Sequence, residues 1–396
     1  MTFPPGRGLL LISPSDYDSA LAKGVAPLLD DFHEDGFFAR VVICFPLTRH
    51  ARRVRLTERT EILECGVPVA RRWLRRLLAP LHVARSVLRL ARLVRDERID
   101  AVRATDPCFS GLLALAIARL ARRPVCVSIH ADYDKRHALA GDAGAPVLLG
   151  SRRLASLVEG FVLSRVDAVW PIRETLVAYA LARGAARERI TVIPHGADLG
   201  LFVSGDGATP PDGLPAGRLV VSFAGRLSRE NYVDDLLSIA RRLGSQRRDF
   251  VLVIAGSGDE EARLATTLAA DPILRDVVRM VGSLDRPAVA GLRRASLVAL
   301  VLMGGFSLIE AAAAGAALVS YDVEWHREIV RDGETGRLLT EHDVDGVVAA
   351  VAAFLDDPAN ARAMGHRAQT LALARHRLDA ATRHKQRCYA ALLAHG

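Results

Sequence analysis

Short apolar runs alternate along the whole chain with longer stretches in which apolar residues recur at helical spacing. In the first half, the runs that predict strands are residues 8–13, 39–45, 99–104, 123–130 and 166–172. In the second half, they are residues 219–225, 249–256, 277–282, 296–303 and 317–322. This alternation is typical of parallel sheets covered by helices. Each half therefore has enough strands for its own doubly wound α/β sheet.

The length of the chain also indicates two domains, because 396 residues exceed what one ordinary core accommodates. Residues 205–217 are rich in Gly and Pro, which continue neither a helix nor a central strand, so we expect the domain linker there. Two Rossmann-like domains that face each other across a cleft would place the carboxyl ends of both sheets along one crevice.

Composition is that of a folded globular protein without a disordered tail: 50% of the residues are hydrophobic, 25% are charged and 5% are aromatic. The five cysteines are scattered and show no C-x-x-C spacing, which predicts reduced thiols in a cytoplasmic protein. The first residues lack the pattern of a secretory signal. The one long apolar window, residues 297–320, is interrupted by glycines and Glu310, so it predicts a buried strand and helix instead of a membrane span.

The net charge of +8 raises the question of an anionic partner. All but three of the 53 basic residues are arginine, and residues 49–98 carry 14 arginines against five acids. Trp73 is the one Phe, Tyr or Trp in this cluster, whereas nucleic-acid-binding surfaces interleave several aromatic residues with the basic ones, so we expect no nucleic-acid partner. Residues 71–95 have a basic amphipathic pattern. Two readings stay open: peripheral contact with the inner face of a membrane, or an ordinary helix with a buried leucine face. Pro80 should break this helix into two pieces.

Four segments in the second half carry a family resemblance: "FAGRLSRENYVDDLL", "VIAGSGDEEARL", "VRMVGSLDR" and "GGFSLIEAAAAGAALVSYDVEWHREIVRDGETGRLL". In order and spacing they resemble the nucleotide-sugar-binding domain of the family 4 retaining glycosyltransferases (glycosyltransferase group 1). The resemblance implies the glycosyltransferase-B fold. It implies an acceptor-side domain at residues 1–190, a donor domain at 191–370, and a C-terminal helix at 371–396 that packs back toward the first domain.

Glu310 lies one turn inside the helix that should follow the strand at 296–303. The first turn of such a helix offers unpaired N–H groups and a positive dipole end to a diphosphate. Glycines at the preceding turn let a ligand approach the main chain closely. Glu310 can accept hydrogen bonds from ribose hydroxyls, which is the role of the matching residue in the resembling family. The donor-binding residues expected in this segment are Gly304, Gly305, Phe306, Ser307 and Leu308.

Arg226, directly after the strand at 219–225, matches the arginine that pairs with the donor diphosphate in the resembling family, and its fork suits two phosphate oxygens. Where the family usually has a lysine, this chain has Asn231, and Arg229 lies nearby. Gly225 and Gly282, each at the end of a strand, complete the predicted donor site.

The chain departs from the family in the carboxylate that contacts the donor sugar. Many members carry a second glutamate eight positions before the helix glutamate, where this chain has Leu302 by strict spacing or Gly304 by alignment on the Gly-Phe pair. We therefore expect contacts to the sugar from backbone amides of residues 305–307.

In the first half, His130 ends a strand where the family often has a histidine near the transferred sugar, and Asp132 is a weaker candidate for the acceptor side. Glu328 matches a glutamate of the family's x-E-I-V-x-D-G segment and is a further acceptor-side candidate. Trp325 and His326 are expected to pack and order the loop.

The three D-x-D triplets occur by chance at this composition, so we assign no metal, and no cofactor beyond the donor substrate. The resemblance implies a retaining glycosyltransferase with His130, Arg226 and Glu310 as catalytic residues. It would move a sugar from a nucleoside diphosphate to a hydroxyl of a glycan, a lipid-linked or a small-molecule acceptor. Two alternatives stay open: a non-catalytic nucleotide-sugar-binding member and a sugar-nucleotide epimerase of the same fold.

Overall fold

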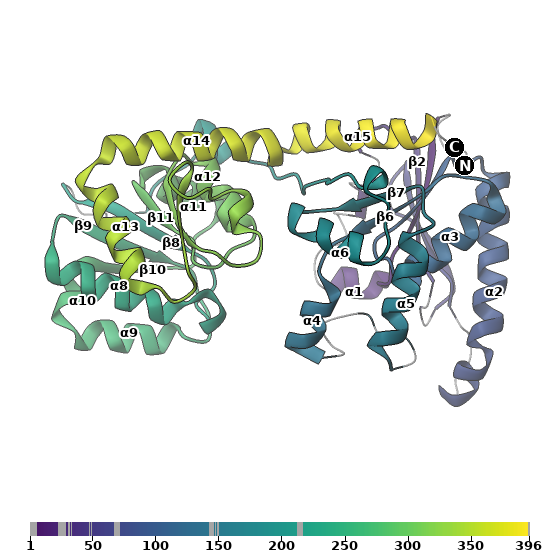
Figure 1. Cartoon of the computed structure of the whole chain (residues 1–396), viewed down its shortest axis with the longest axis horizontal. Helices are drawn as coiled ribbons and strands as arrows, with labels where there is room; N and C mark the ends of the chain where they lie inside the picture. The colour runs from purple at the N-terminus through teal and green to yellow at the C-terminus, as the bar shows by residue number, and fades with distance from the viewer. Residues whose placement is uncertain are drawn as a thin grey trace. The chain divides into compact units, whose positions relative to one another are not determined.

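The structure is a computed structural model that describes residues 6–22, 29–30, 32, 34–46, 48, 50–66, 72–141, 146, 148, 150–211 and 217–394. The chain folds into two compact units, which are described separately (Figure 1). Unit 1 comprises Met1–Pro194 and Thr382–Gly396, and unit 2 comprises His195–Ala381. The division between them therefore falls at Pro194 and again inside the last helix.

Unit 1 is built on a seven-stranded sheet of order β3-β4-β2-β1-β5-β6-β7, in which only β3 pairs antiparallel with its neighbour. Its strands are β1 (Gly8–Ile12), β2 (Arg40–Phe45), β3 (Arg52–Arg55), β4 (Thr60–Glu64), β5 (Ala101–Ala104), β6 (Val125–Ile129) and β7 (Ala168–Pro171). Its helices are α1 (Tyr17–Ala22), α2 (Arg72–Asp96), α3 (Phe109–Ala121), α4 (Tyr133–Ala140), α5 (Arg152–Leu163), α6 (Val177–Ala182) and the greater part of α15 (Leu378–Ala394).

Alternate residues of the unit 1 strands face two separate cores, as expected for a sheet covered on both faces. Leu10 and Ile12 pack with α2 and α3, whereas Leu9 and Leu11 pack in the core that contains Tyr389 of α15. The Tyr389 hydroxyl accepts a hydrogen bond from Arg103 Nη1 at 3.0 Å, so α15 is anchored to this sheet.

Unit 2 has a fully parallel sheet of order β10-β9-β8-β11-β12-β13. Its strands are β8 (Leu219–Ala224), β9 (Phe250–Ala255), β10 (Val278–Gly282), β11 (Val298–Leu300), β12 (Ala317–Tyr321) and β13 (Gly336–Leu339). Its helices are α7 (Gly200–Ser204), α8 (Val233–Gln246), α9 (Glu261–Ala270), α10 (Pro272–Val277), α11 (Arg286–Ala295), α12 (Phe306–Ala313), α13 (Val344–Asp356) and α14 (Pro358–His376). Val298 and Leu300 face the core with α8 and α13, and Ala299 faces the core with α12 and α14.

All ten predicted strands are present, and the doubly wound α/β class is confirmed in both units. Two predictions were wrong. The segment 205–217 is not the linker, because it lies inside unit 2: a Cβ added to Gly291 of α11 would lie 2.2 Å from the carbonyl carbon of Thr209. A composition rich in Gly and Pro marks a loop without saying which elements it connects.

The break at Pro80 was the second error, because α2 runs through it as one helix. A proline inside a helix costs about 3 kcal/mol for the lost hydrogen bond and the clash with the preceding turn. The later part of α2 offsets such a cost by burying Leu90, Ala91 and Val94 in the unit 1 core. No helix in the described ranges combines the length and hydropathy that a membrane span needs.

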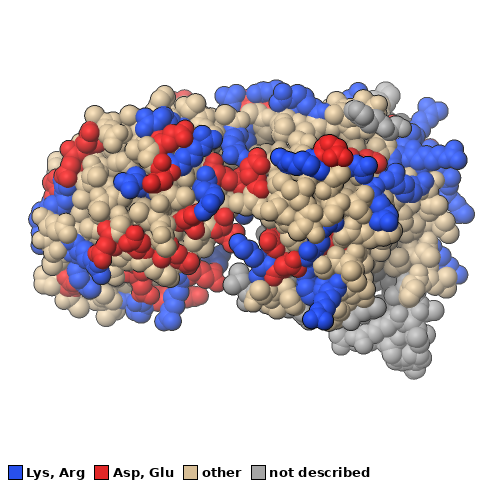
Figure 2. Space-filling model, viewed as in Figure 1, with Lys and Arg blue, Asp and Glu red and all other residues tan. Residues whose placement is uncertain are grey.

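The surface of unit 2 shows acidic and basic side chains intermixed, whereas basic side chains gather at the α2 and α3 end of unit 1 (Figure 2).

Candidate functional site

The carboxyl edge of the unit 2 sheet brings most of the predicted donor residues together. β9, β8 and β11 are parallel neighbours, so the loops that follow them meet at one edge. The loop after β8 contains Gly225 and Arg226, and the turn after β11 contains Gly304 and Gly305 and leads into α12. In open α/β sheets this edge is where ligands bind.

The main chains of the loops after β8 and β9 touch each other at two glycines. Gly256 has φ +137°, and a Cβ there would lie 1.9 Å from the Gly225 carbonyl oxygen. A Cβ on Gly258 would lie 2.3 Å from the Leu227 carbonyl oxygen. Any side chain at either position would push the two loops apart, so both glycines shape the edge. The two glycines of the segment 256–258 thus have a packing role that the sequence analysis did not identify.

The amino terminus of α12 is open to a ligand. Gly305 is its N-cap and provides no side chain to bond the first N–H groups. A Cβ on Gly305 would meet no atom within 4 Å, so there is free space above the turn. Unpaired N–H groups and the helix dipole attract an anion to such a position.

A buried histidine holds the turn before α12 in place. His326 is fully buried, and its Nε2 lies 3.1 Å from Gly304 N, which donates to it. Its Nδ1 lies 2.6 Å from Ser320 Oγ. The imidazole therefore links the turn to β12, which agrees with the loop-ordering role expected for this residue.

Arg293 of α11 lies beneath the same turn and was missed by the sequence analysis. Its side chain is 1% exposed, and its Nη2 donates to the Ala224 carbonyl oxygen at 3.1 Å and to Ser307 Oγ at 2.7 Å. Within the described part of the chain, its Nε and Nη1 have no hydrogen-bond partner. Burial lowers the pKa of Arg293 to about 10, with a partial offset from the charge of Glu310. A buried cation thus lies next to the open helix terminus.

Glu310 lies one turn into α12, with a side chain 19% exposed. Its nearest cation is Arg286, whose Nη1 lies 3.5 Å from Oε1. Burial raises the pKa of Glu310 above its ordinary value, and the charges of Arg286 and Arg293 offset part of this rise. The carboxylate is therefore partly desolvated, so any hydroxyl that donates to it contributes more than one bound in water.

The loop after β8 presents one unpaired arginine. Arg226 is exposed, and among the residues that the structure describes its guanidinium has no partner. Arg229 is less free, because its Nε donates to Glu260 Oε1 at 2.9 Å. Asn231 Nδ2 donates to the Arg226 carbonyl oxygen at 2.8 Å, so this residue orders the loop. Gly282 at the end of β10 has φ +69°, and its carbonyl accepts from Gly256 N at 2.7 Å.

Leu302 and the Glu328 side chain are both largely removed from solvent. Leu302 is fully buried in the core of unit 2. By strict spacing it occupies the position of the family's sugar-binding glutamate, so a side chain at that position does not reach solvent. The Glu328 side chain is 8% exposed and lies 3.3 Å from Arg375 Nη2 of α14. This ion pair joins Glu328 to α14 within unit 2, and an acceptor-side role for Glu328 stays a prediction.

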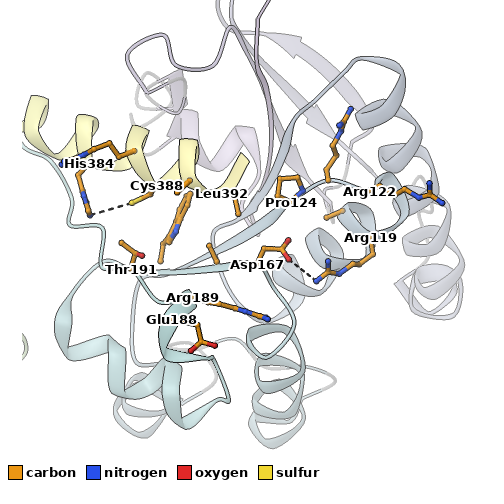
Figure 3. Close-up of a pocket in the computed structure, with 16 residues that line it drawn as sticks. Arg119, Arg122, Pro124, Asp167, Glu188, Arg189, Thr191, His384, Cys388 and Leu392 are labelled. Carbon is orange, nitrogen blue, oxygen red and sulfur yellow. Dashed lines mark hydrogen bonds and ion pairs between the residues drawn. The ribbon is translucent and has the colours of Figure 1, made fainter. Parts of the chain in front are cut away.

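In unit 1, His130 directly follows β6 and is partly exposed. Asp132 caps α4, where its Oδ1 accepts from the N–H groups of Asp134 and Lys135, each at 3.0 Å. Asp132 therefore has a capping role that is independent of any substrate. Unit 1 also contains a cavity of about 1030 Å³ at the opposite, amino edge of its sheet (Figure 3).

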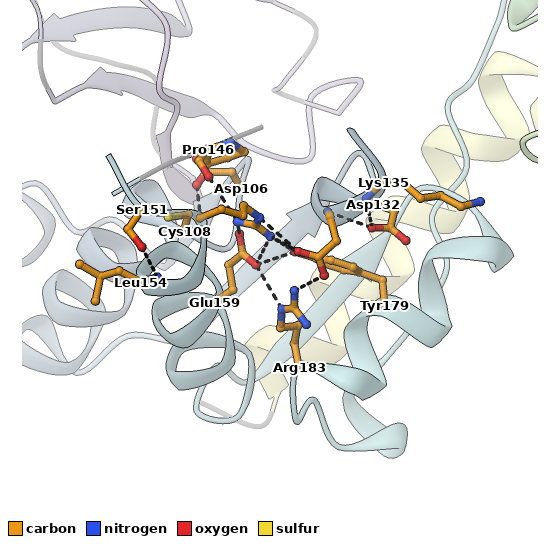
Figure 4. Close-up of polar contacts among 12 residues, drawn as sticks. Asp106, Cys108, Asp132, Lys135, Pro146, Ser151, Leu154, Glu159, Tyr179 and Arg183 are labelled. Carbon is orange, nitrogen blue, oxygen red and sulfur yellow. Dashed lines mark hydrogen bonds and ion pairs between the residues drawn. The ribbon is translucent and has the colours of Figure 1, made fainter. Parts of the chain in front are cut away.

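A buried carboxylate network joins α5 to α6 and to the residue that follows it in unit 1 (Figure 4). Glu159 is fully buried and accepts from both terminal nitrogens of Arg152, at 2.5 and 2.8 Å, and from the Tyr179 hydroxyl at 2.6 Å. Arg183 Nε adds a fourth contact at 3.3 Å. Nearby, burial raises the pKa of Asp106, whose Oδ2 has no hydrogen-bond partner in the described part of the chain.

Comparison with known proteins identifies the family. Residues 209–371 match the model of the glycosyl transferases group 1, and residues 22–196 match the model of the glycosyl transferase 4-like domain. This chain belongs to the group 1 glycosyl transferase family. The group 1 match covers all the donor-side residues described above.

Among curated relatives, a glycogen synthase of Mycobacterium tuberculosis is 30% identical over 70% of this chain and 66% of its own length. A D-inositol 3-phosphate glycosyltransferase of Nocardia farcinica is 33% identical over 59% of this chain and 54% of its own length. The chain thus aligns with less than two thirds of either relative.

Solved structures share the fold at low identity. Sucrose-phosphate synthase from Thermosynechococcus elongatus matches with a TM-score of 0.63 at 19% identity, over 98% of this chain and all of that chain. The Anabaena protein HepE in complex with UDP matches with a TM-score of 0.67 at 15% identity, over 97% of this chain and all of that chain. The glycosyltransferase-B fold is thereby confirmed.

No cluster of three or more His, Cys, Asp or Glu side chains in the described ranges is arranged to hold a metal ion.

Proposed function

We propose that this protein is a retaining glycosyltransferase that moves a sugar from a nucleoside diphosphate to an acceptor hydroxyl. The observation that carries the proposal is the carboxyl edge of unit 2. There the open amino terminus of α12 lies next to the buried cation Arg293, and the partly buried Glu310 lies one turn into the same helix. The exposed Arg226 follows β8, the strand beside β11. The family match supports sugar transfer as the reaction.

The chemistry follows from the charge that develops during transfer. As the bond between sugar and phosphate breaks, negative charge grows on the diphosphate, and fixed N–H groups and cations nearby stabilise it. The N–H groups at the start of α12 and the guanidinium of Arg226 are suited to contact the diphosphate directly. Glu310 would accept hydrogen bonds from the ribose. The positive charge comes from the protein, so the proposal requires no metal and no cofactor beyond the donor.

The buried position of Leu302 supports the view that backbone amides of residues 305–307 contact the sugar. Retention would follow from attack on the same face that the diphosphate leaves, with the leaving phosphate taking the acceptor proton. This step uses no protein nucleophile, and His130 of unit 1 would contact the transferred sugar. The retaining stereochemistry and the role of His130 rest on the family resemblance.

The proposed acceptor is a hydroxyl group of a glycan, of a lipid-linked molecule or of a small molecule. The names of the curated relatives include both a glycogen synthase and inositol-phosphate glycosyltransferases. A cytoplasmic location with peripheral contact to the membrane through residues 71–95 is part of this proposal. Leu81 and Leu88 on α2 are each 50% exposed, which leaves an apolar strip for that contact. Residues 72–79 provide the rest of the predicted pattern, and their side chains lie outside the described part.

The first test is thermal unfolding with UDP, GDP, ADP or dTDP, for the parent protein, Glu310→Ala and the control Glu58→Ala, an exposed glutamate of unit 1. A nucleotide at 100 times its dissociation constant stabilises by about 2.7 kcal/mol. One nucleotide should stabilise the parent and the control but not Glu310→Ala. If no nucleotide stabilises the parent, the proposed donor site is wrong. If a nucleotide binds but its sugar conjugate is never consumed with any acceptor, the non-catalytic alternative replaces the enzyme.

A further inference from the structure

The cavity of unit 1 in Figure 3 lies between the start of β6, the start of β7, the end of α3 and one side of α15. Pro124 immediately precedes β6, and Ala168 is the first residue of β7. Apolar atoms of Ala118, Ala168 and Leu392 contribute to its wall. The volume of about 1030 Å³ is enough for a ligand of metabolite size.

This cavity is separate from the carboxyl edge of the same sheet. His130 follows the last residue of β6, whereas Pro124 precedes the first, and the five residues between span about 16 Å at 3.3 Å per residue. A ligand in the cavity therefore does not touch the edge on which His130 lies. Whatever binds there has a function other than being the sugar donor or acceptor.

The lining of the cavity is strongly basic. Five arginines contribute to it: Arg119, Arg122, Arg123, Arg189 and Arg387. His384 is also part of the wall, and the lining acids are Asp167 and Glu188. The cavity thus has an excess of three positive charges before any histidine is protonated.

Most of these arginines are not neutralised by the protein. In the described part of the chain, the guanidinium groups of Arg122, Arg123 and Arg387 have no hydrogen-bond or ion-pair partner. Arg122 and Arg387 are exposed, whereas the Nε of Arg123 is buried without a partner. The Arg189 guanidinium donates to the Val166 carbonyl oxygen at 3.2 Å. Asp167 is engaged by Val125 N at 2.8 Å and by Arg119 at 3.4 Å, so it does not offset the other charges.

The contrast with the rest of unit 1 is informative. Arg152 and Arg183 are neutralised by two carboxylates, those of the buried Glu159 and of Asp134. Unpaired like charges around one cavity repel each other, and the buried Nε of Arg123, which has no partner in the described part of the chain, costs free energy. A bound anion would remove both penalties. An arginine fork matches two phosphate oxygens at once, which a single chloride ion does not exploit.

We propose that this cavity binds a phosphate-bearing anion. Arg122 and Arg123 from the end of α3 and Arg387 from α15 would hold the phosphate, with His384 beside them. Because α15 enters unit 1 from unit 2, such a ligand would also fasten α15 to the edge of the β6 and β7 strands. The phosphate belongs either to a soluble metabolite or to a lipid headgroup, and the test distinguishes the two.

The test uses hydrogen–deuterium exchange of the full chain with inorganic phosphate or pyrophosphate. The pocket variant Arg122→Gln/Arg123→Gln/Arg387→Gln is compared with the control variant Arg136→Gln/Arg153→Gln/Arg362→Gln, which removes three exposed arginines elsewhere and so keeps the same net charge. Pyrophosphate should protect peptides covering residues 119–125, 165–170 and 384–392, and affinity at these peptides should fall at least ten-fold in the pocket variant only. Protection confined to α12 would report the donor site and overturn the proposal for unit 1.

A second arm tests the lipid source. The parent protein and both variants are floated with phosphatidylglycerol vesicles and with phosphatidylcholine vesicles. Flotation on phosphatidylglycerol alone, lost in the pocket variant and kept in the control, assigns the cavity to a headgroup. If neither pyrophosphate nor vesicles distinguish the two variants, the cavity binds no phosphate and the proposal is wrong. Should the triple variant fail to fold, Arg387→Gln alone, at an exposed position of α15, should still weaken binding about three-fold.

Discussion

Arg293 permits a test in which stability and ligand binding should move in opposite directions. Its guanidinium is 1% exposed, and burial lowers its pKa to about 10. This lowering of the pKa from the usual arginine value corresponds to about 3 kcal/mol of unfavourable free energy for the charged form of the side chain. The lost hydrogen bonds of Nη2 to Ala224 and Ser307 are worth about 1 kcal/mol, since Ser307 Oγ still donates to the Ala224 carbonyl at 2.8 Å. Arg293→Met should therefore raise the free energy of unfolding of the ligand-free protein by about 2 kcal/mol.

The same substitution should weaken nucleotide binding. An anion held by the N–H groups at Ser307 would lie about 7 Å from the guanidinium, since Nη2 is 2.7 Å from Ser307 Oγ. At an effective dielectric constant near 20, two unit charges at that separation attract by about 2 kcal/mol. The dissociation constant for the nucleoside diphosphate should therefore rise about 30-fold.

Urea unfolding without ligand and calorimetric titration with the nucleotide measure the two effects. Arg293→Lys keeps the charge and should retain most of the affinity. Arg242→Met removes an exposed arginine of α8 whose ion pair with Asp345 is also exposed, so it should change either quantity by no more than about 0.5 kcal/mol. If Arg293→Met destabilises the ligand-free protein and leaves nucleotide affinity unchanged, Arg293 is a packing residue and our reasoning on the buried cation is refuted.

Three further results are expected. Burial raises the pKa of Glu310, so the folded protein binds a proton there more readily than the unfolded chain does. The contribution of Glu310 to the free energy of unfolding is therefore present at low pH and is lost as the pH rises through the folded pKa. Nucleotide affinity should show the opposite trend and fall with protonation of Glu310, at a pH above that of an ordinary glutamate; Glu310→Gln should abolish this pH dependence. Arg286→Gln removes the offsetting cation and should move the acidic fall in affinity to higher pH, as titration of binding against pH would show. Glu159→Gln leaves Arg152 and Arg183 without their buried carboxylate and should lower the free energy of unfolding by about 3 kcal/mol in urea, whereas Arg119→Gln, at an exposed pair, should change it by less than about 1 kcal/mol.

The sequence pattern predicted those strands that are apolar runs and missed those that are not. β3 and β4 contain charged residues, and a search for apolar runs passes over them. In the structure Glu61 of β4 is 5% exposed, and its Oε1 lies 2.6 Å from Arg53 Nη2. The burial of this glutamate depends on an ion pair with β3, and spacing along one strand does not show a partner on another. The short strand β13 was missed because Gly336 and Arg337 interrupt its pattern.

The candidate site was predictable to the extent that its residues follow strands. Arg226 and the turn at Gly304 stand at the carboxyl ends of β8 and β11, a position that topology alone makes functional. Arg293 has no such signature, because it lies in the last turn of an amphipathic helix next to Arg294, and basic residues in a last turn usually face solvent. Only the packing of α11 against the end of β8 separates them: Arg294 donates to carbonyl oxygens of α7, and Arg293 points under the α12 turn. This chain has Asn231 where its family usually has a lysine, but Arg293 of α11 lies under the turn before α12. Only the folded structure shows that this cation reaches the donor site.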